Sequence, residues 1–274
     1  LAEQERLCEN LGGGVGVDGT ATRLPGEPVD IEDPVIADVT GDGFPDVVGR
    51  ARVFLGPESA ALLINSGGAG FADASATLPS VPEVDSVAVI DADTDGDLEL
   101  AVAGSGHRLF VNDGLGNFSS GPTIGPPAVV RDHLPADVDG DGDTDLFVSV
   151  FFGTPIRLVI NDGTGVFMDE SALRLPPEAL FANQVADYDS DGDVDVLVST
   201  ADGQFWAVND GSGVFCRCCG TPLRRSCSAA TSTGDPVCSS TAAERASSIS
   251  RYRRLRSPTP GPSSGGQPLW LTST

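Results

Sequence analysis

The sequence predicts an all-β fold made of repeated units of four antiparallel strands, and three observations support this. An acidic text of nine residues occurs four times, with its copies 53, 46 and 50 residues apart. A second text, close to Asn-x-Gly-x-Gly-x-Phe, runs in step with the first. The chain has 34 Gly and 20 Pro but only 6% aromatic residues, so we expect many turns and a core of Val, Leu, Ile and Ala rather than a helical bundle.

Each acidic text lies between two predicted strands. The third copy reads Asp137-Val-Asp-Gly-Asp-Gly-Asp-Thr-Asp145, and the others begin at Asp38, Asp91 and Asp187. The run from Ser86 to Ile90 precedes one copy, and the run from Leu98 to Ala103 follows it. Leu146 to Phe152 and Val194 to Ser199 follow later copies. These runs are rich in β-branched and aliphatic residues, as strands are.

The second text closes a third strand in each repeat. Short apolar runs such as Leu158 to Ile160 and Trp206 to Val208 end in Asn-Asp-Gly, which favours a tight turn with positive φ. A fourth strand is expected at the Phe that follows. Four strands in about 50 residues match one blade of a β-propeller. We therefore expect about four blades plus part of an earlier one, in an incomplete ring.

The domain prediction follows from these repeats. Residues 1–33 are expected to end a preceding blade, residues 34–216 to form four blades, and residues 217–274 to form a tail. A weaker copy of the second text starts at Asn10, which places the beginning of the sequence in the middle of a repeat.

The acidic text has the pattern of a calcium loop. Ca²⁺ takes six to eight oxygens, and a loop with oxygens at positions 1, 3, 5, 7 and 9 can surround it. Position 7 is expected to give a backbone carbonyl, and the Gly at position 6 permits the sharp turn. The predicted ligands are Asp38, Thr40, Asp42, Phe44, Asp46, Asp91, Asp93, Asp95, Asp97, Glu99, Asp137, Asp139, Asp141, Asp143, Asp145, Asp187, Asp189, Asp191, Asp193 and Asp195.

Other interpretations of these loops are less favourable. Solvated acidic turns are common, but four copies in one register would be self-repelling without a cation. The helix-loop-helix calcium motif needs Glu at position 12, where this sequence has Gly49, Val102, Val148 and Val198. Mg²⁺ demands a tighter octahedron and keeps its waters.

At this point the residues resemble a known family. Asp-x-Asp-x-Asp-Gly-x-x-Asp within a repeat of this length resembles the FG-GAP or VCBS repeat, which forms the β-propeller of integrin α-subunits and of many secreted bacterial proteins. The resemblance covers roughly Asn10 to Phe215. It implies one Ca²⁺ in each loop, about four in all. Thr40 at position 3 and Glu99 at position 9 depart from the pattern, so their two sites are expected to be weaker.

The charge constrains partners and location. A formal net charge of −24 disfavours nucleic acid and anionic membranes, and no apolar stretch is long enough to insert into a membrane. The resemblance implies an extracellular or cell-surface protein, although no signal peptide is visible in this sequence. It also implies a scaffold, adhesion or ligand-binding module whose partner is an extracellular protein or glycan. The alternative is a propeller domain of a secreted polysaccharide-degrading enzyme.

We expect no catalysis by this chain. Its only histidines are His107 and His133, and neither lies in a nucleophile motif. A Gly-x-Ser-x-Gly match around Ser263 lies in a Pro- and Ser-rich stretch with no strand before it, and is interpreted as chance.

The character of the chain changes at Cys216. From there on it has only 2 acidic residues beside 8 Arg, and it holds five of the six Cys. Three interpretations stay open: a disordered linker, a small disulfide or metal module, and a frameshift. Read in an alternate frame, Ala230 to Gly234 can encode Asp-Val-Asp-Gly, which resembles the acidic text.

Overall fold

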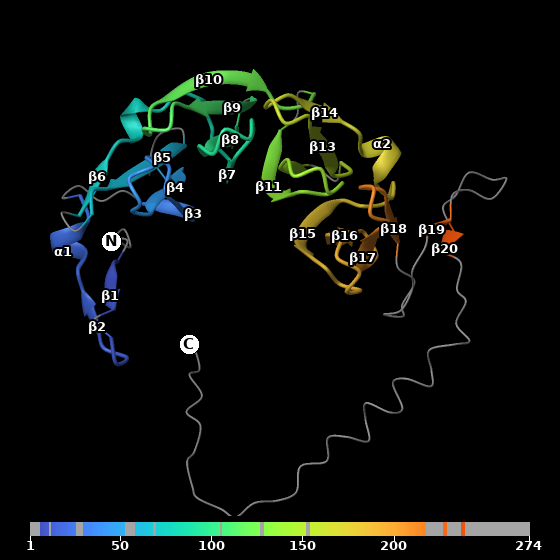
Figure 1. Ribbon diagram of the computed structural model, residues 1–274, viewed down its shortest axis with the longest axis horizontal. Coiled ribbons are helices and arrows are strands. Elements are labelled where there is room, and N and C mark those ends of the chain that lie inside the picture. Colours follow the sequence, from blue (N-terminus) through green and yellow to red (C-terminus); the bar gives the residue numbers. More distant parts are fainter. Residues whose placement is uncertain are drawn as a thin grey trace, which may run out of the picture. The chain divides into compact units, whose positions relative to one another are not determined.

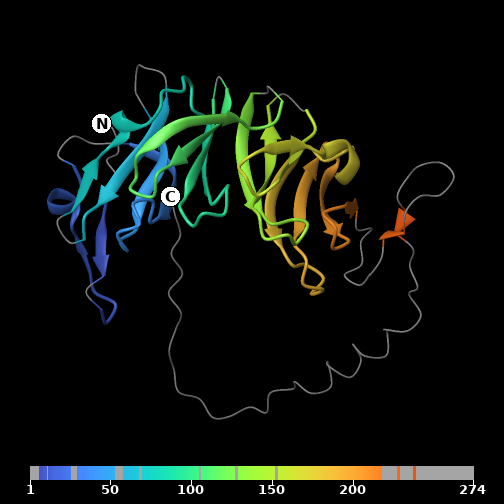
Figure 2. The same cartoon turned by 45° about the horizontal axis from the view of Figure 1, so that its top comes forward.

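The computed structural model describes residues 6–10, 12–25, 30–52, 58–67, 70–104, 106–126, 129–151, 154–217, 227–228 and 237–238. Within these residues it contains four antiparallel sheets of four strands each, whose strands follow one another in chain order (Figures 1 and 2). The predicted tail lies outside the described residues except for Arg217 and two short paired strands, β19 (Cys227–Ser228) and β20 (Val237–Cys238).

Each sheet is one blade. Blade 1 consists of β3 (Ile31–Ala37), β4 (Asp46–Ala51), β5 (Ser59–Asn65) and β6 (Phe71–Asp73). Blade 2 consists of β7 (Ser86–Ile90), β8 (Glu99–Ala103), β9 (His107–Asn112) and β10 (Phe118–Thr123). Blade 3 consists of β11 (Val130–Ala136), β12 (Asp145–Val150), β13 (Arg157–Asn161) and β14 (Phe167–Asp169). Blade 4 consists of β15 (Phe181–Ala186), β16 (Asp195–Thr200), β17 (Gly203–Asn209) and β18 (Phe215–Arg217).

The remaining elements are short. A two-stranded antiparallel sheet of β1 (Cys8–Asn10) and β2 (Gly16–Asp18) precedes blade 1. The helices are α1 (Thr20–Arg23), α2 (Ser171–Arg174) and a single 3₁₀ turn, η1 (Ser75–Thr77). None of the helices in the described part of the chain has the length and hydropathy needed to cross a membrane.

The all-β prediction with four-stranded blades is confirmed, and the strands lie close to where the sequence places them. The predicted strand from Ser86 to Ile90 is β7 without change. Blade 1 begins at Ile31, three residues before the expected boundary at 34, and blade 4 ends at Arg217. The second strand of each blade begins at position 9 of the acidic text.

Apolar side chains from neighbouring blades share common cores. Between blades 3 and 4, Phe147 and Leu158 pack with Val196, Val198 and Phe215. Similar clusters join blades 1 and 2 and blades 2 and 3. The strands β8 and β12 are buried along their whole length, which explains their continuous apolar runs. Burying one Leu in such a core contributes about 1.5–3 kcal/mol, so contact between blades is a main source of stability.

Candidate metal centre

The four acidic loops occupy equivalent places in the four blades. Loop 1 (38–46), loop 2 (91–99), loop 3 (137–145) and loop 4 (187–195) each join the first strand of a blade to the second. The glycines at position 6 have positive φ in every loop: Gly43 at 87°, Gly96 at 93°, Gly142 at 96° and Gly192 at 103°. A residue with a Cβ is strained in that conformation, so the structure confirms the predicted sharp turn.

Carboxylates at positions 1 and 5 shape the turn. In loop 3 the Asp137 carboxylate accepts the N–H of Gly142 at 3.1 Å, and the Asp141 carboxylate accepts the N–H of Asp143 at 3.0 Å. Loop 4 repeats both bonds, from Gly192 to Asp187 and from Asp193 to Asp191, at 3.2 Å each. The position-5 side chains are exposed, including Asp141.

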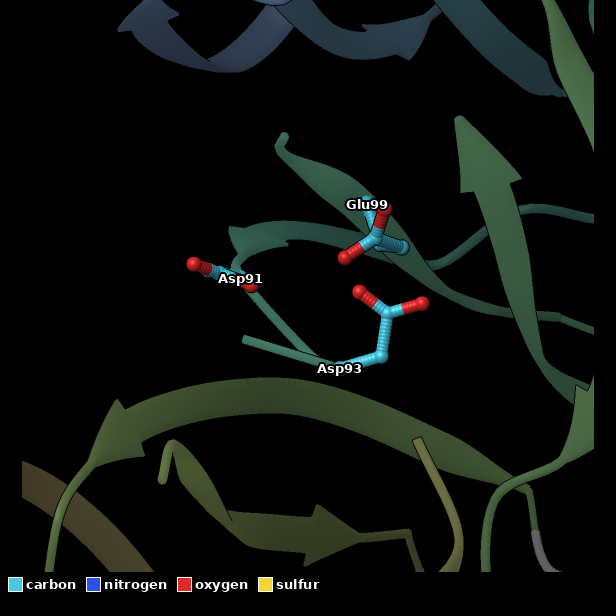
Figure 3. Close-up of side chains that lie close together, drawn as sticks. All are labelled: Asp91, Asp93 and Glu99. Carbon is cyan, nitrogen blue, oxygen red and sulfur yellow. The ribbon is translucent and has the colours of Figure 1, made fainter. Parts of the chain in front are cut away.

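Positions 1, 3 and 9 converge in three of the loops. One carboxylate oxygen from each of the three positions lies within 4.8 Å of the other two. Figure 3 shows the set in loop 2, where the carboxylates of Asp93 and Glu99 face each other and that of Asp91 lies to one side. The three sets are Asp91, Asp93 and Glu99; Asp137, Asp139 and Asp145; and Asp187, Asp189 and Asp195.

The position-9 carboxylate is buried and also joins the two repeated texts. In loop 3, Asp145 is 1% exposed. One of its oxygens accepts the N–H of Val138 at 3.0 Å, and the other accepts the N–H of Asn161 at 2.8 Å. Asp46 and Asp195 make the same pair of bonds in loops 1 and 4. The residue predicted to close a metal shell therefore also holds the loop to the turn after the third strand.

Several oxygens in these sets have no hydrogen-bond partner. Among the residues that the structure describes, six buried side-chain nitrogen or oxygen atoms lack a partner. Five of them are carboxylate oxygens at positions 1, 3 and 9 of loops 2 to 4: those of Asp91, Asp93, Glu99, Asp139 and Asp189. Glu99 is only 1% exposed. A buried acceptor without a donor is costly, so these oxygens fit a cation better than they fit the bare protein.

The pKa values of the carboxyls at positions 3 and 9 of loops 2 to 4 are all raised. Desolvation by burial, together with the charges of Asp93 and Asp95, raises the pKa of Glu99 to about 7. Burial raises the pKa of Asp145 to about 6, and burial with the neighbouring Asp191 charge raises that of Asp189 to about 6. The ionised loops are therefore disfavoured without a compensating positive charge.

Loop 1 differs because position 3 is Thr40. Its hydroxyl lies 3.4 Å from an oxygen of Asp38 and 3.4 Å from one of Asp46, so it stands where a third carboxylate stands in the other loops. The pKa of Asp38 is lowered, because backbone N–H groups, with that of Gly43 the largest contributor, outweigh its desolvation. Loop 1 thus has less negative charge and less need of a cation.

An arginine that sequence reasoning missed reaches loop 3. The Arg174 guanidinium in α2 lies 3.2 Å from the Asp139 carboxylate and 2.5 Å from that of Glu170. It also donates to the carbonyl of Ser212 at 2.6 Å. Arg174 therefore neutralises part of the charge of loop 3. The sequence pattern around Arg174 gives no sign of this contact.

The position-7 side chains lie against the turn that follows the third strand of the same blade. A Cβ at Gly163 would overlap the Asp143 carboxylate, and one at Gly211 would overlap that of Asp193. Gly114 and Gly67 stand in the same relation to Asp97 and Phe44. The glycine of each turn thus leaves room for the position-7 side chain of its own repeat. Of the carboxylates predicted as ligands in loops 2 to 4, the structure groups those at positions 1, 3 and 9. The backbone carbonyl at position 7 and the carboxylate at position 5 stay predictions.

A second buried polar cluster joins blades 2 and 3. The Nε2 atoms of His107 and His133 lie 2.6 Å apart, and Nδ1 of His133 lies 3.0 Å from the Ser86 hydroxyl. Burial lowers the pKa of His107 to about 4, and burial together with the neighbouring His107 lowers the pKa of His133 well below its usual value. A neutral imidazole pair, in which one ring donates to the other, satisfies this geometry. The two histidines are thus structural partners, which their separation in the sequence did not indicate.

Comparisons with known proteins agree with this architecture. The FG-GAP-like repeat family matches residues 91–148 and 137–198, which span loops 2, 3 and 4. No curated protein matches the chain. Among solved structures, a lectin from Agrocybe aegerita, described as recognising non-reducing terminal N-acetylglucosamine, is similar with a TM-score of 0.53 and 18% identity.

The match to the lectin covers 77% of this chain and 58% of the lectin. The Photorhabdus luminescens Tc holotoxin pore matches with a TM-score of 0.41 and 22% identity, over 71% of this chain and 10% of that one. At these identities the lectin supports the fold alone. The repeated loops, the four-stranded blades and the family match lead to one conclusion: residues 91–198 carry FG-GAP-like repeats within an all-β architecture of propeller-like blades.

Proposed function

We propose that the protein is a calcium-binding scaffold in which each acidic loop holds one structural Ca²⁺. The observation that carries the proposal is the group of five buried carboxylate oxygens without a donor in loops 2 to 4. Carboxylate oxygens are the ligands that Ca²⁺ prefers, and a bound ion would supply the positive charge that offsets their repulsion. Loop 1, with Thr40 in place of a carboxylate, would bind more weakly.

Calorimetric titration of the full chain, freed of metal with a chelator, tests this proposal. We expect about four Ca²⁺ ions to bind, with Mg²⁺ binding more weakly because it keeps its waters. Ca²⁺ should also raise the unfolding temperature, since a ligand that binds only the folded state stabilises it. A chain that binds no Ca²⁺ and unfolds at the same temperature in Ca²⁺ and in chelator would contradict the proposal.

We also propose that the scaffold works outside the cell and binds a protein or glycan without catalysing a reaction. Extracellular Ca²⁺ is abundant enough to fill loops of modest affinity. Glycans are the first ligands to test, because the lectin of similar fold recognises terminal N-acetylglucosamine.

A glycan panel that includes this sugar, probed with and without Ca²⁺, tests the ligand class. Calcium-dependent binding would support it, whereas a panel without binding would leave proteins as the expected partners. The enzymatic alternative is tested with the same preparation by an assay for new reducing ends on polysaccharides, where we expect none.

A further inference from the structure

The peptide at position 2 of each acidic loop lies between the ligand-bearing positions 1 and 3. In loop 2 this residue is Ala92, which is fully buried. Its N–H donates to the Glu99 carboxylate of the same loop at 2.8 Å. Its carbonyl accepts a hydrogen bond from the side-chain amide of Asn161, also at 2.8 Å. Asn161 belongs to the following repeat, so two repeats together fix this peptide.

Loops 1 and 3 show the same arrangement. The amide of Asn112 donates to the carbonyl of Val39 at 2.8 Å, and the amide of Asn209 donates to that of Val138 at 2.7 Å. We call Asn112, Asn161 and Asn209 the bridging asparagines. Each is the first residue of the Asn-Asp-Gly text, and each reaches back about one and a half repeats to the preceding loop. All three are buried, at 7%, 2% and 3% exposure.

The turn that begins at each bridging asparagine approaches the preceding loop closely. A Cβ placed on Gly116 would lie 2.8 Å from the side chain of Thr40 at position 3 of loop 1. A Cβ on Gly213 would lie 3.2 Å from that of Asp139 at position 3 of loop 3. The second glycine of the repeated text is therefore needed where the turn meets a ligand-bearing residue of the blade before it.

We propose that each bridging asparagine is a positioning residue for the metal loop of the preceding repeat, so that cation binding in that loop and packing of the next blade stabilise each other. The inference rests on the proposed calcium binding. An amide that fixes the position-2 peptide also fixes the backbone that carries the carboxylates on either side. A loop ordered in advance loses less entropy when the ion binds. By thermodynamic linkage, the ion must then strengthen the contact between blades by the same factor.

Loop 4 provides an internal comparison. Its position-2 residue, Tyr188, donates its N–H to Asp195 at 2.8 Å, as in the other loops. Among the described residues, however, no side-chain amide donates to the Tyr188 carbonyl. Tyr188 is 37% exposed and stacks on Trp206, whereas Val39, Ala92 and Val138 are at most 2% exposed. Within the described residues, loop 4 therefore shows the same local bonds without an amide donor from a following repeat.

A pair of matched variants separates positioning from general destabilisation. The side-chain amide of Asn161 donates to the preceding loop, whereas that of Asn65 donates to Pro45 in its own loop at 3.1 Å. Asn161→Ala and Asn65→Ala both keep a backbone N–H bond to the position-9 Asp and both lose a turn bond to a glycine. The two variants thus differ mainly in one respect. Asn161→Ala removes an amide donor from the loop of the preceding blade, loop 2, whereas Asn65→Ala removes one from the loop of its own blade, loop 1.

The readout is a Ca²⁺ titration of the full chain followed by NMR, with the position-6 glycine amide of each loop as its reporter. In Asn161→Ala we expect the Ca²⁺ affinity of loop 2 to fall about tenfold, because a buried carbonyl loses its donor, while the affinities of loops 3 and 4 stay unchanged. Asn65→Ala should leave loop 2 unchanged. Without metal, hydrogen exchange at the Ala92 amide should be faster in Asn161→Ala than in the unaltered chain.

The outcomes are distinguishable. If the unaltered chain binds Ca²⁺ but Asn161→Ala binds it with the same affinity in loop 2, the positioning role is wrong and the proposed function stands. If the variant weakens all four loops equally, the asparagine is only structural and the inference is overturned. If the unaltered chain binds no Ca²⁺ at all, the proposed function fails first.

Discussion

Replacing Glu99 by Gln should change stability in opposite directions with and without calcium. Glu99 is 1% exposed, and burial raises its pKa from 4.5 to about 7. At 1.36 kcal/mol per pKa unit, keeping this carboxyl ionised in the folded state costs about 3 kcal/mol at pH 8. Gln keeps the shape, removes the charge and offers an N–H to the unpartnered oxygen of Asp93. The metal-free variant should therefore be more stable than the unaltered chain by up to about 3 kcal/mol.

With calcium, the difference in stability between Glu99→Gln and the unaltered chain should become smaller or change sign. An ion at about 100 times its dissociation constant stabilises the folded state by about 2.7 kcal/mol per site, and the Gln variant has lost a charged ligand of loop 2. Denaturant unfolding at pH 8 in chelator measures the effect of removing the charge, and the same experiment in Ca²⁺ measures how much stability the ion adds. Glu83→Gln, the same change at an exposed residue, is the control. If Glu99→Gln were no more stable than the unaltered chain in chelator and gained as much from Ca²⁺, the assignment of Glu99 as a repelled ligand would be refuted.

Three further predictions follow from the same geometry. Metal-free protein should lose stability as pH rises from about 4 to about 7. The folded state holds the proton of Asp145 up to about pH 6 and that of Glu99 up to about pH 7, whereas the unfolded state releases both near their ordinary pKa values of 3.8 and 4.5. Denaturant unfolding in chelator at pH 5 and 8 checks this sign. Thr40→Asp should strengthen calcium binding by loop 1 about tenfold, which calorimetry would show, since it supplies the position-3 carboxylate that loops 2, 3 and 4 have. Leu158→Ala should destabilise the chain by about 2–5 kcal/mol, whereas Leu115→Ala, at a residue 71% exposed, should change unfolding by less than about 0.5 kcal/mol.

Local patterns in the sequence predicted the strands and the turns well. Position 6 had to be glycine because its φ is positive, and the strands ended where Asp and Asn interrupt the apolar runs. The pattern could also group Asp137, Asp139 and Asp145, since neighbours along one loop stay close in space. These features depend on residues within about ten positions of each other, which is the range that composition and spacing report.

Contacts between repeats could not be predicted in the same way. Asn161 was interpreted as a turn residue, and it does begin a turn, but its amide bonds to Ala92, 69 residues earlier. Arg174 and the pair of His107 and His133 are similar cases, because packing of one element on another decides which atoms meet. Periodicity identifies the elements and leaves such partners open. Trp206 lies in the apolar run that predicts a third strand, and the pattern did not indicate that its ring stacks on the exposed Tyr188.

The bond from Asn161 to Ala92 has a consequence for the order in which the chain acquires structure during synthesis. A ribosome adds residues from the N-terminus, so loop 2 is complete well before Asn161 exists. Domains fold progressively as they emerge. Loops 1, 2 and 3 therefore each spend the time needed to make about 70 residues in a form held only by their own blade. These three loops should mature in order along the nascent chain, each about one and a half repeats behind the growing end.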